Sequence, residues 1–257
     1  MAIFNYYCRK FELNIRSIST STDTSFVKDR FERHSGPITS NDLFLLYQER
    51  EPNITRSTIN WRIYELVNAH VLKRIGRGLF LLGKEVVYHY YFSDKLKSIN
   101  TFIQKNLPYI NYCLWDSSVV NEFAQHISGH HFVLVDVERD AAESVYHLLK
   151  DQHKPVFFRL NERLFSDLVT DFDQPLIVRY LVSESPVDNS NDGPSPMLEK
   201  LLVDFFCDQE FSFLQGSELF SVYRNAFSKY TVNQTKLLRY AARKGKKDEI
   251  QQYLTKL

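Results

Sequence analysis

Basic residues between positions 53 and 84 are the strongest candidates for a functional site in this sequence. This stretch holds six lysines and arginines against a single acid, Glu65. Phosphate contact needs such a local excess of positive charge, because salt screens the field of a charge within about 8 Å under physiological conditions. The stretch therefore predicts a nucleic-acid contact, although the formal net charge of the whole chain is only +1.

The apolar residues of the same stretch predict a helix with a polar outer face. Ile59, Ile63 and Leu66 share one stripe at helical spacing, which places Trp61 on the opposite side. Two short apolar runs then flank Gly76-Arg77-Gly78, a turn that would present a cation at the tip of a hairpin. We predict DNA contacts from these two elements, at Arg56, Ser57, Thr58, Asn60, Trp61, Arg62, Lys73, Arg74 and Arg77. Two alternatives stay open: Trp61 packs against the linker or a second domain, and the hairpin is an ordinary solvated one.

Acidic residues farther along the chain offer a nuclease alternative. Asp116, Asp136 and Glu138 fall near strand ends, with Arg139 beside them, and two-metal nucleases use carboxylates placed in this way. We favour the interpretation that these acids cap the next helix and lie at a solvated strand end. The spacing of Asp140 and Glu143 fits such a capping pair.

Histidines near the middle of the chain are the candidates for a metal site. His126, His130, His131 and Cys113 have metal-binding side chains, but Gly129 interrupts the helix, and adjacent histidines in a strand face opposite ways. Gly216-Ser217 resembles the start of a nucleotidyltransferase site but lacks the carboxylate pair that holds the metal in such sites. No hydrolase, P-loop or dinucleotide-binding motif is found. We expect no enzymatic activity, no metal and no other cofactor.

The C-terminal tail carries a second group of cations. An amphipathic helix there could contact DNA that flanks the main site or an acidic partner, or it could pack on the acidic middle of the chain through its own charge. We leave these interpretations open for Lys236, Arg239, Arg243, Lys244, Lys246 and Lys247.

Composition and charge set the class of protein. The chain has 257 residues, 44% of them hydrophobic, which is enough for a sizeable core. Charge is distributed as +5 over residues 1–100, −9 over 101–235 and +5 over 236–257. Cys8, Cys113 and Cys207 are about a hundred residues apart, so we expect reduced thiols. No apolar run approaches the roughly 18 residues of a membrane helix, so we expect a cytoplasmic protein without membrane contact.

The order of the expected elements predicts an α+β protein: an N-terminal winged helix-turn-helix, then a mixed α/β domain with a helical C-terminal tail. We expect a flexible leader over residues 1–24, the winged helix over 25–84, a connecting helix over 85–106 and the second domain over 107–257. In the second domain we expect strands over 109–115, 132–137, 156–159 and 175–182, and a loop over 183–196. Helices are expected over 117–126, 141–150, 197–207, 217–230 and 233–257.

The run STINWRIYELVNAHVLKRIGRGLFLL, residues 57–82, closely resembles the N-terminal winged helix of AbiEi-type antitoxins. These are the regulatory proteins of the bacterial abortive-infection AbiE systems, which are type IV toxin–antitoxin pairs. The resemblance continues through YINYCLWDSSVVNEFAQH, FVLVDVERDAAESVYHLLK and PLIVRYLVSESP, and spans roughly residues 25–257. Asn68-Ala69-His70 stands where a turn with glycine is commoner.

This resemblance implies a phage-defence protein that represses its own operon by binding double-stranded promoter DNA. It also implies a second domain that counteracts a nucleotidyltransferase-type toxin, often without a stable complex. It assigns Ser57, Thr58, Trp61 and Arg62 to the recognition helix, and Arg74 and Arg77 to the wing. The alternatives are a metal-dependent nuclease with a DNA-binding domain, and an ordinary winged-helix repressor with a ligand-sensing domain.

Overall fold

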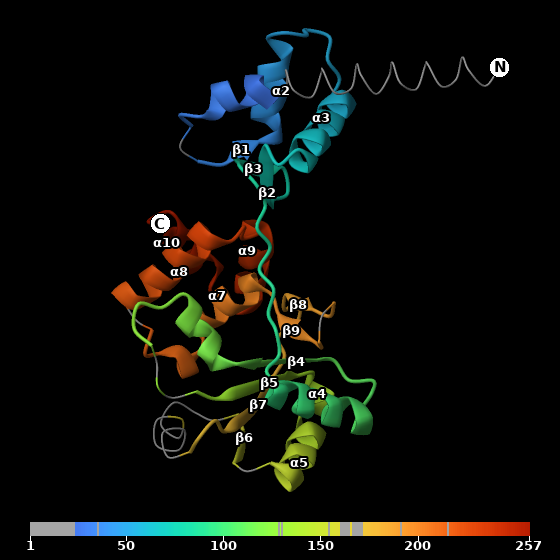
Figure 1. Ribbon diagram of the computed structural model, residues 1–257, viewed down its shortest axis with the longest axis vertical. Coiled ribbons are helices and arrows are strands. Elements are labelled where there is room, and N and C mark those ends of the chain that lie inside the picture. Colours follow the sequence, from blue (N-terminus) through green and yellow to red (C-terminus); the bar gives the residue numbers. More distant parts are fainter. Residues whose placement is uncertain are drawn as a thin grey trace, which may run out of the picture. The chain divides into compact units, whose positions relative to one another are not determined.

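The computed structural model describes residues 24–34, 36–127, 129, 131–153, 155–159, 165, 172–190, 192–214 and 216–257. The chain forms two compact units, one that ends at Val86 and one over Val87–Leu257 (Figure 1). Helices and strands are mixed, and the C-terminal region is helical. The expected leader apart from Thr24, together with Cys8 and His130, lies outside the described residues.

The first unit combines three helical segments with a small antiparallel sheet. Residues 24–31 are helical. They are followed by β1 (Ile38–Thr39), α2 (Ser40–Gln48), α3 (Arg56–Asn68), β2 (Leu72–Gly76) and β3 (Leu79–Leu82). Strand β3 lies between β1 and β2, so the expected two-stranded ribbon is in fact a three-stranded sheet.

Local hydrogen bonds explain where the helices of this unit begin. Thr39 caps α2 in a reciprocal capping box with Asp42, and Thr55 caps α3 by accepting a hydrogen bond from the Thr58 amide at 3.2 Å. Ile59, Ile63 and Leu66 are buried on the inner side of α3, as their spacing predicts. These residues join the core of the first unit, which also includes Val27, Leu43, Tyr47, Leu72 and Phe80.

Two turns of the first unit depend on a left-handed backbone. His70 has a φ of 57° after the end of α3, in the turn where glycine is commoner. Gly78 has a φ of 70° in the hairpin turn, and its carbonyl accepts a hydrogen bond from the Ser40 amide at 2.9 Å. The tip of the β2–β3 hairpin is therefore fixed to the first residue of α2.

The second unit begins with an irregular stretch rather than with the expected connecting helix. Residues 87–93 have no regular secondary structure, and α4 (Asp94–Asn106) starts where Ser93 caps it. Tyr88, Tyr90 and Phe92 alternate with exposed residues, which is the pattern of an extended strand. Helix α4 packs into the core of the second unit through its buried face and does not serve as a linker.

A four-stranded mixed sheet forms the centre of the second unit. It consists of β4 (Tyr112–Asp116), β5 (Val133–Val137), β6 (Val156–Phe158) and β7 (Leu176–Tyr180) in the order β4-β5-β7-β6. Strands β5, β6 and β7 are parallel, and β4 runs antiparallel to β5. Helix α5 (Ala142–Gln152) connects β5 to β6, and Figure 1 shows the sheet between α5 and the C-terminal helices.

Several expected elements of this unit differ from the structure. The segment after β4 is a 3-10 helix over Ser117–Glu122 rather than a longer α-helix. The expected loop over 183–196 contains two short paired strands, β8 (Val187–Asp188) and β9 (Ser195–Pro196). The tail is two helices, α9 (Gln234–Arg243) and α10 (Lys247–Leu254), because Gly245 between them has a φ of 72°.

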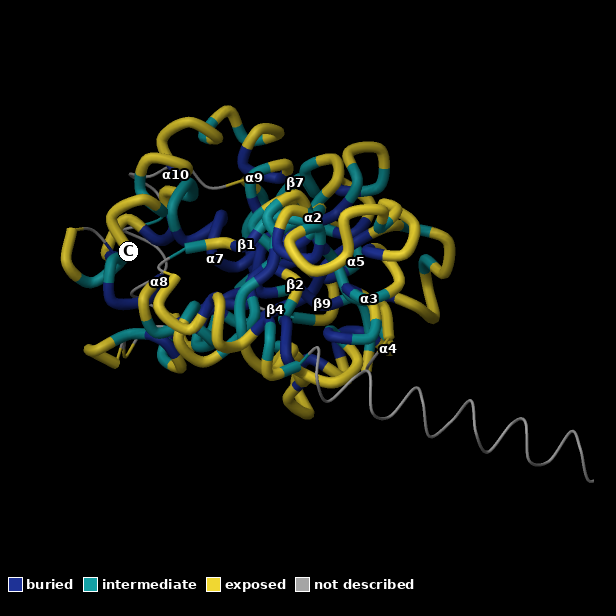
Figure 2. Tube along the Cα trace, turned by 90° about the horizontal axis from the view of Figure 1, so that it is seen from above, coloured by how far each residue is buried: buried dark blue, intermediate teal, exposed yellow. Residues whose placement is uncertain are grey.

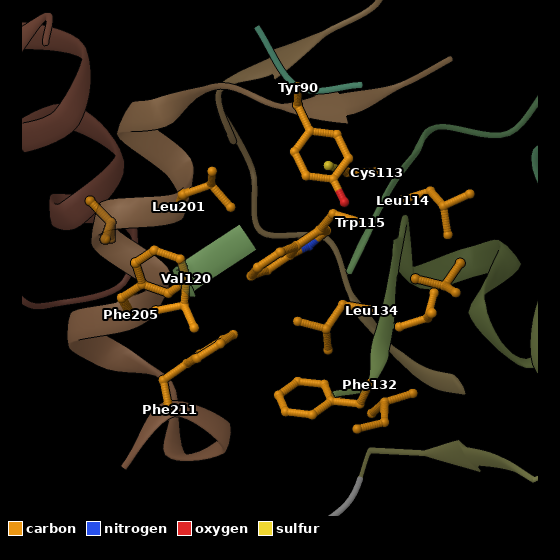
Figure 3. Close-up of a cluster of buried hydrophobic side chains, with 14 of the residues drawn as sticks. Tyr90, Cys113, Leu114, Trp115, Val120, Phe132, Leu134, Leu201, Phe205 and Phe211 are labelled. Carbon is orange, nitrogen blue, oxygen red and sulfur yellow. The ribbon is translucent and has the colours of Figure 1, made fainter. Parts of the chain in front are cut away.

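The C-terminal helices cover the sheet around one large aromatic side chain. Helix α7 (Leu198–Cys207) is buried along most of its length, while α8 (Ser217–Lys229) buries one face (Figure 2). Trp115 from β4 stacks on Phe211 at a centroid distance of 5.6 Å and lies beside Phe205 of α7 (Figure 3). Its indole Nε1 donates a hydrogen bond to Asp136 at 3.0 Å, which links the apolar core to a polar cluster.

Candidate nucleic-acid interface and a buried ion-pair cluster

Helix α3 presents a polar and aromatic outer face. The indole of Trp61 is 46% exposed and the ring of Tyr64 is 59% exposed. Ser57, Asn60 and Asn68 are exposed as well, so the face extends over the length of the helix. Tyr64 was not among the predicted contacts, although its position five residues after Ile59 puts it on the same side as Trp61. Trp61 and Tyr64 thus place two exposed aromatic rings on one face of α3.

The cations of α3 are directed toward other residues of the first unit. Arg62 donates to both carboxylate oxygens of Glu51, at 2.8 and 2.9 Å, and its guanidinium lies 4.7 Å from the ring centre of Tyr47. Arg56 donates to Asn41 at 3.4 Å and lies 4.6 Å from the ring centre of Phe44. The charge of Arg62 therefore serves an intramolecular ion pair, and its predicted DNA contact stays a prediction.

The β2–β3 hairpin carries exposed cations close to its turn. Arg74 is exposed on β2 with its guanidinium 5.2 Å from the ring centre of Phe80, its register partner on β3. Arg77 is exposed in the turn itself, and Lys73 is half-buried. A side chain at Gly78 would meet the Ser40 hydroxyl at 3.2 Å, so the turn and α2 fit closely. The hairpin therefore holds its cations on a fixed support.

A network of buried charges lies at the carboxyl ends of β5 and β7 in the second unit. Asp136 and Arg179 are register partners on these strands, and Arg179 Nε donates to Asp136 at 2.7 Å. Lys200 of α7 donates to Asp136 at 2.7 Å and to Asp204 at 2.5 Å. Lys200 is 1% exposed and Asp204 fully buried. Such charges are tolerated because each has an oppositely charged partner.

The segment directly after α7 and the C-terminal end of α9 contribute the rest of this network. Tyr240 donates to Asp204 at 2.8 Å, and Lys244 donates to Asp204 at 2.7 Å and also to Asp208. Arg179 reaches Asp208 at 3.0 Å and Glu210 at 3.3 Å. We call Asp136, Arg179, Lys200, Asp204, Asp208, Glu210, Tyr240 and Lys244 the ion-pair cluster. Most of these residues also line an open cavity of about 330 Å³.

Burial and ion pairing have opposite effects on the pKa values of the carboxyl groups in the cluster, and the balance differs from one group to the next. Burial alone would raise the pKa of Asp136, but Arg179 and Lys200 hold that pKa well below its usual value. Lys200 and Lys244 likewise keep the pKa of Asp204 low against the effect of burial. Burial and the neighbouring Asp204 raise the pKa of Asp208 despite its two cationic partners. Because its charges pair with one another, the cluster fastens α7 and α9 to the sheet.

The acids of the nuclease alternative are not brought together. Asp116 faces Val133 in the β4–β5 register, whereas Asp136 faces Cys113 near the other end of that pair. Asp116 caps the 3-10 helix, and Glu138 accepts hydrogen bonds from the backbone and side-chain amides of Asn111. Among the described residues no group of three His, Cys, Asp or Glu side chains could hold a metal ion.

The structure also places the expected capping pair and the candidate metal ligands. Asp140 and Glu143 do not form the expected capping pair, because neither the 3-10 turn Arg139–Ala141 nor α5 has a side-chain cap. Arg139 instead lies 5.0 Å from the ring centre of Tyr180. Of the histidine candidates, His126 pairs with Glu218 at 2.8 Å. Cys113 is buried in β4 as a free thiol, and burial raises its pKa.

The tail cations are largely engaged within the second unit. Lys244 belongs to the ion-pair cluster, and Arg239 and Arg243 both pair with Glu184. Lys246 pairs with Glu249, Lys236 contacts the Met197 sulfur at 3.2 Å, and Lys247 is exposed. The geometry favours the alternative in which the tail packs on the acidic middle of the chain through its own charge.

These features define a mixed α+β protein with a helical C-terminal region, and with two separate polar sites. None of its described helices has the length and apolar character needed to cross a membrane. The chain belongs to the DUF6577 family, a family of unknown function, whose family model matches residues 58–257. The match starts within α3 and covers all of the second unit. No curated protein matches the sequence.

Proposed function

We propose that the protein is a DNA-binding transcriptional repressor of its own operon, and that its first unit is a winged helix-turn-helix. Helix α3 would enter the major groove as the recognition helix, with α2 as the preceding helix and the β2–β3 hairpin as the wing. One observation carries this proposal: the first unit joins the exposed face of α3 to a rigid hairpin with exposed Arg74 and Arg77.

The contacts divide into two kinds in this proposal. Arg74 and Arg77 would bind phosphates and set the position of the protein on the duplex, and Lys73 would support them. Ser57, Thr58, Asn60 and Trp61 would reach base edges, because the early residues of a recognition helix lie deepest in the groove. Arg62 would act indirectly, because its ion pair with Glu51 fixes α3 to the chain before it.

The antitoxin role rests on the resemblance to AbiEi-type proteins. We propose that the second unit counteracts a nucleotidyltransferase-type toxin from the same operon, without a stable complex, in the cytoplasm of a bacterium under phage attack. We do not propose a nuclease, since the three acids lie apart or serve structural bonds.

DNA binding is tested by a gel-shift titration of the full chain on the DNA upstream of its own gene and on a scrambled sequence, at two salt concentrations. We expect tighter binding to the upstream DNA and a loss of affinity with salt. Arg77→Ala should weaken binding to both sequences and lower the salt slope by about one unit. Trp61→Ala should weaken binding to the upstream DNA more than to the scrambled one.

Arg224→Ala is the matched control, because Arg224 is an exposed arginine on α8 of the other unit. Wild-type affinity in both the Arg77 and the Trp61 variants would show that the docking face is wrong. Equal affinity for upstream and scrambled DNA would refute operon-specific repression.

The antitoxin role needs a separate test in living cells. We expect the gene next to this one to arrest growth when expressed alone, and this protein to restore growth when co-expressed. The Arg77→Ala variant should still restore growth from a foreign promoter, because the hairpin serves repression rather than neutralisation. Growth arrest that persists despite folded wild-type protein would refute the antitoxin role and leave the repressor proposal standing.

A further inference from the structure

The exposed residues of α3 are mostly uncharged, which limits the bases they can recognise; the half-buried Glu65 is the acid of this helix. Of the exposed residues of α3, Arg56 at the first position is charged, and the others are Ser57, Thr58, Asn60, Trp61, Tyr64 and Asn68. Guanine is usually read in the major groove by an Arg or Lys that binds O6 and N7. Adenine is read by an Asn or Gln amide that binds N6 and N7, and the thymine methyl by apolar contact.

The two arginines of α3 have other partners. Arg62 is held by both oxygens of Glu51 and packs on Tyr47, and its side chain is 17% exposed. Arg56 is drawn toward α2 by its bond to Asn41 and by the ring of Phe44. Between these two arginines, the outer face of α3 offers amide, hydroxyl and aromatic groups.

We propose that α3 recognises A·T base pairs in the operator, with adenine read by the Asn60 amide. Tyr64 lies one helical turn after Asn60, Trp61 is the next residue along the chain, and both supply exposed ring surfaces for thymine methyl groups. Positive charge for the phosphates comes from the hairpin, which carries no base information. This inference rests on the proposed DNA-binding function and narrows it to a class of operator.

The first experiment selects the sequences that the full-length protein binds from a random DNA pool. Wild-type protein should enrich a motif made of A·T pairs, with one adenine that does not vary. Asn60→Ala should lose the preference at that position and bind the selected site about 5- to 150-fold more weakly, as expected for a lost bidentate base contact. Asn60→Arg should shift the preference at that position to guanine.

Modified bases then identify the atoms in contact. Replacing the invariant adenine by 7-deazaadenine removes N7 and should weaken the wild type but not Asn60→Ala. Replacing thymine by uracil removes the methyl group and should weaken binding by the wild type. At the thymine that Trp61 contacts, binding by Trp61→Ala should not change, and at the thymine that Tyr64 contacts, binding by Tyr64→Ala should not change. Asn106→Arg is the matched control for Asn60→Arg, because Asn106 is exposed at the end of α4 in the other unit.

The outcomes separate this inference from the proposed function. A selected motif with invariant G·C pairs, unchanged in Asn60→Ala, would overturn A·T recognition while the repressor proposal stands. No enrichment of any sequence would overturn both. Trp61→Ala that leaves the selected motif and affinity unchanged, but alters the oligomeric state, would assign the face to a protein contact and also overturn the inference.

Discussion

Replacing Lys200 by methionine is the sharpest perturbation of the second unit. The Nζ atom of Lys200 donates to Asp136 at 2.7 Å and to Asp204 at 2.5 Å, and it lies 5.2 Å from the ring centre of Trp115. Methionine has a similar length and no charge, so the variant removes the cation with little change of volume. The two carboxylates would stay buried with one fewer cation to share.

The expected loss of stability follows from this geometry. Breaking a buried ion pair by removal of one partner costs about 3–5 kcal/mol, because the remaining charge is left without compensation. Asp136 keeps Arg179 and the Trp115 indole, and Asp204 keeps Lys244 and Tyr240. We therefore expect Lys200→Met to lower the free energy of unfolding at pH 7 by about 3 kcal/mol, the lower end of that range.

Urea unfolding followed by tryptophan fluorescence measures this loss. Trp115 is fully buried against the cluster, so its emission reports on the same region. Lys97→Met is the matched control: Lys97 pairs with Asp192 at the surface, 3.3 Å apart, and its loss should not shift the transition measurably. A loss below about 1 kcal/mol for Lys200→Met would refute the view that the cluster fastens α7 and α9 to the sheet.

The pH dependence of stability provides a second readout of the same cluster. The pKa values of Asp136 and Asp204 are lower in the folded protein than the usual 3.8, so the folded state holds fewer protons in acid than the unfolded chain. Their contribution is complete above about pH 5 and is lost as the pH falls. Asp208, with a raised pKa, acts in the opposite direction and reduces the slope. In Lys200→Met the remaining carboxylates protonate more readily, so the difference from the wild type should shrink in acid.

Three further substitutions test individual contacts. His70→Gly should raise the unfolding temperature by a few degrees, because His70 has a φ of 57° and glycine adopts this backbone at lower cost; an unchanged or lower temperature would refute this. Gly78→Ala should destabilise the first unit by about 1–2 kcal/mol, because Gly78 has a φ of 70° and the new methyl group would press on Ser40. Urea unfolding measures this loss, and an unchanged midpoint would contradict the prediction. Tyr240→Phe should cost about 1.5–3 kcal/mol in the same assay, because it removes a buried hydrogen bond to a charged Asp204, and a neutral effect would show that water replaces it.

Some elements of the first unit could be predicted because their signals are local. The apolar period of α3 and the glycines of the hairpin act over a few residues, and they indicated a helix and a hairpin where α3, β2 and β3 lie. Strand β1 was missed because two residues carry too little pattern, and their pairing with β3 is a long-range contact. The start of α4 was misplaced because the predicted helix was extended back through the aromatic residues 88–92, whose side chains favour an extended chain over a helix.

The ion-pair cluster could not be predicted because its members are far apart in the chain. Asp136 attracted attention as a nuclease acid and Lys244 as a tail cation, but nothing in the sequence pairs them with Arg179 or Lys200. The topology brings them together: parallel pairing sets Arg179 beside Asp136, and the tail returns over the ends of these strands. Lys200 and Asp204, four residues apart on a helix rich in apolar residues, were the available sign, since charged residues are rarely buried without a partner.

Ion pairs of the C-terminal tail bear on where the proposed DNA contact lies. The tail was a candidate because of its charge of +5, yet Arg239, Arg243, Lys244 and Lys246 each bind a carboxylate of the second unit. A cation that already neutralises a protein carboxylate releases few counterions when a phosphate approaches. The middle of the chain adds a net charge of −9, which repels phosphates. In the proposed repressor, the attraction for DNA therefore comes from the first unit, while the tail cations serve contacts within the second unit.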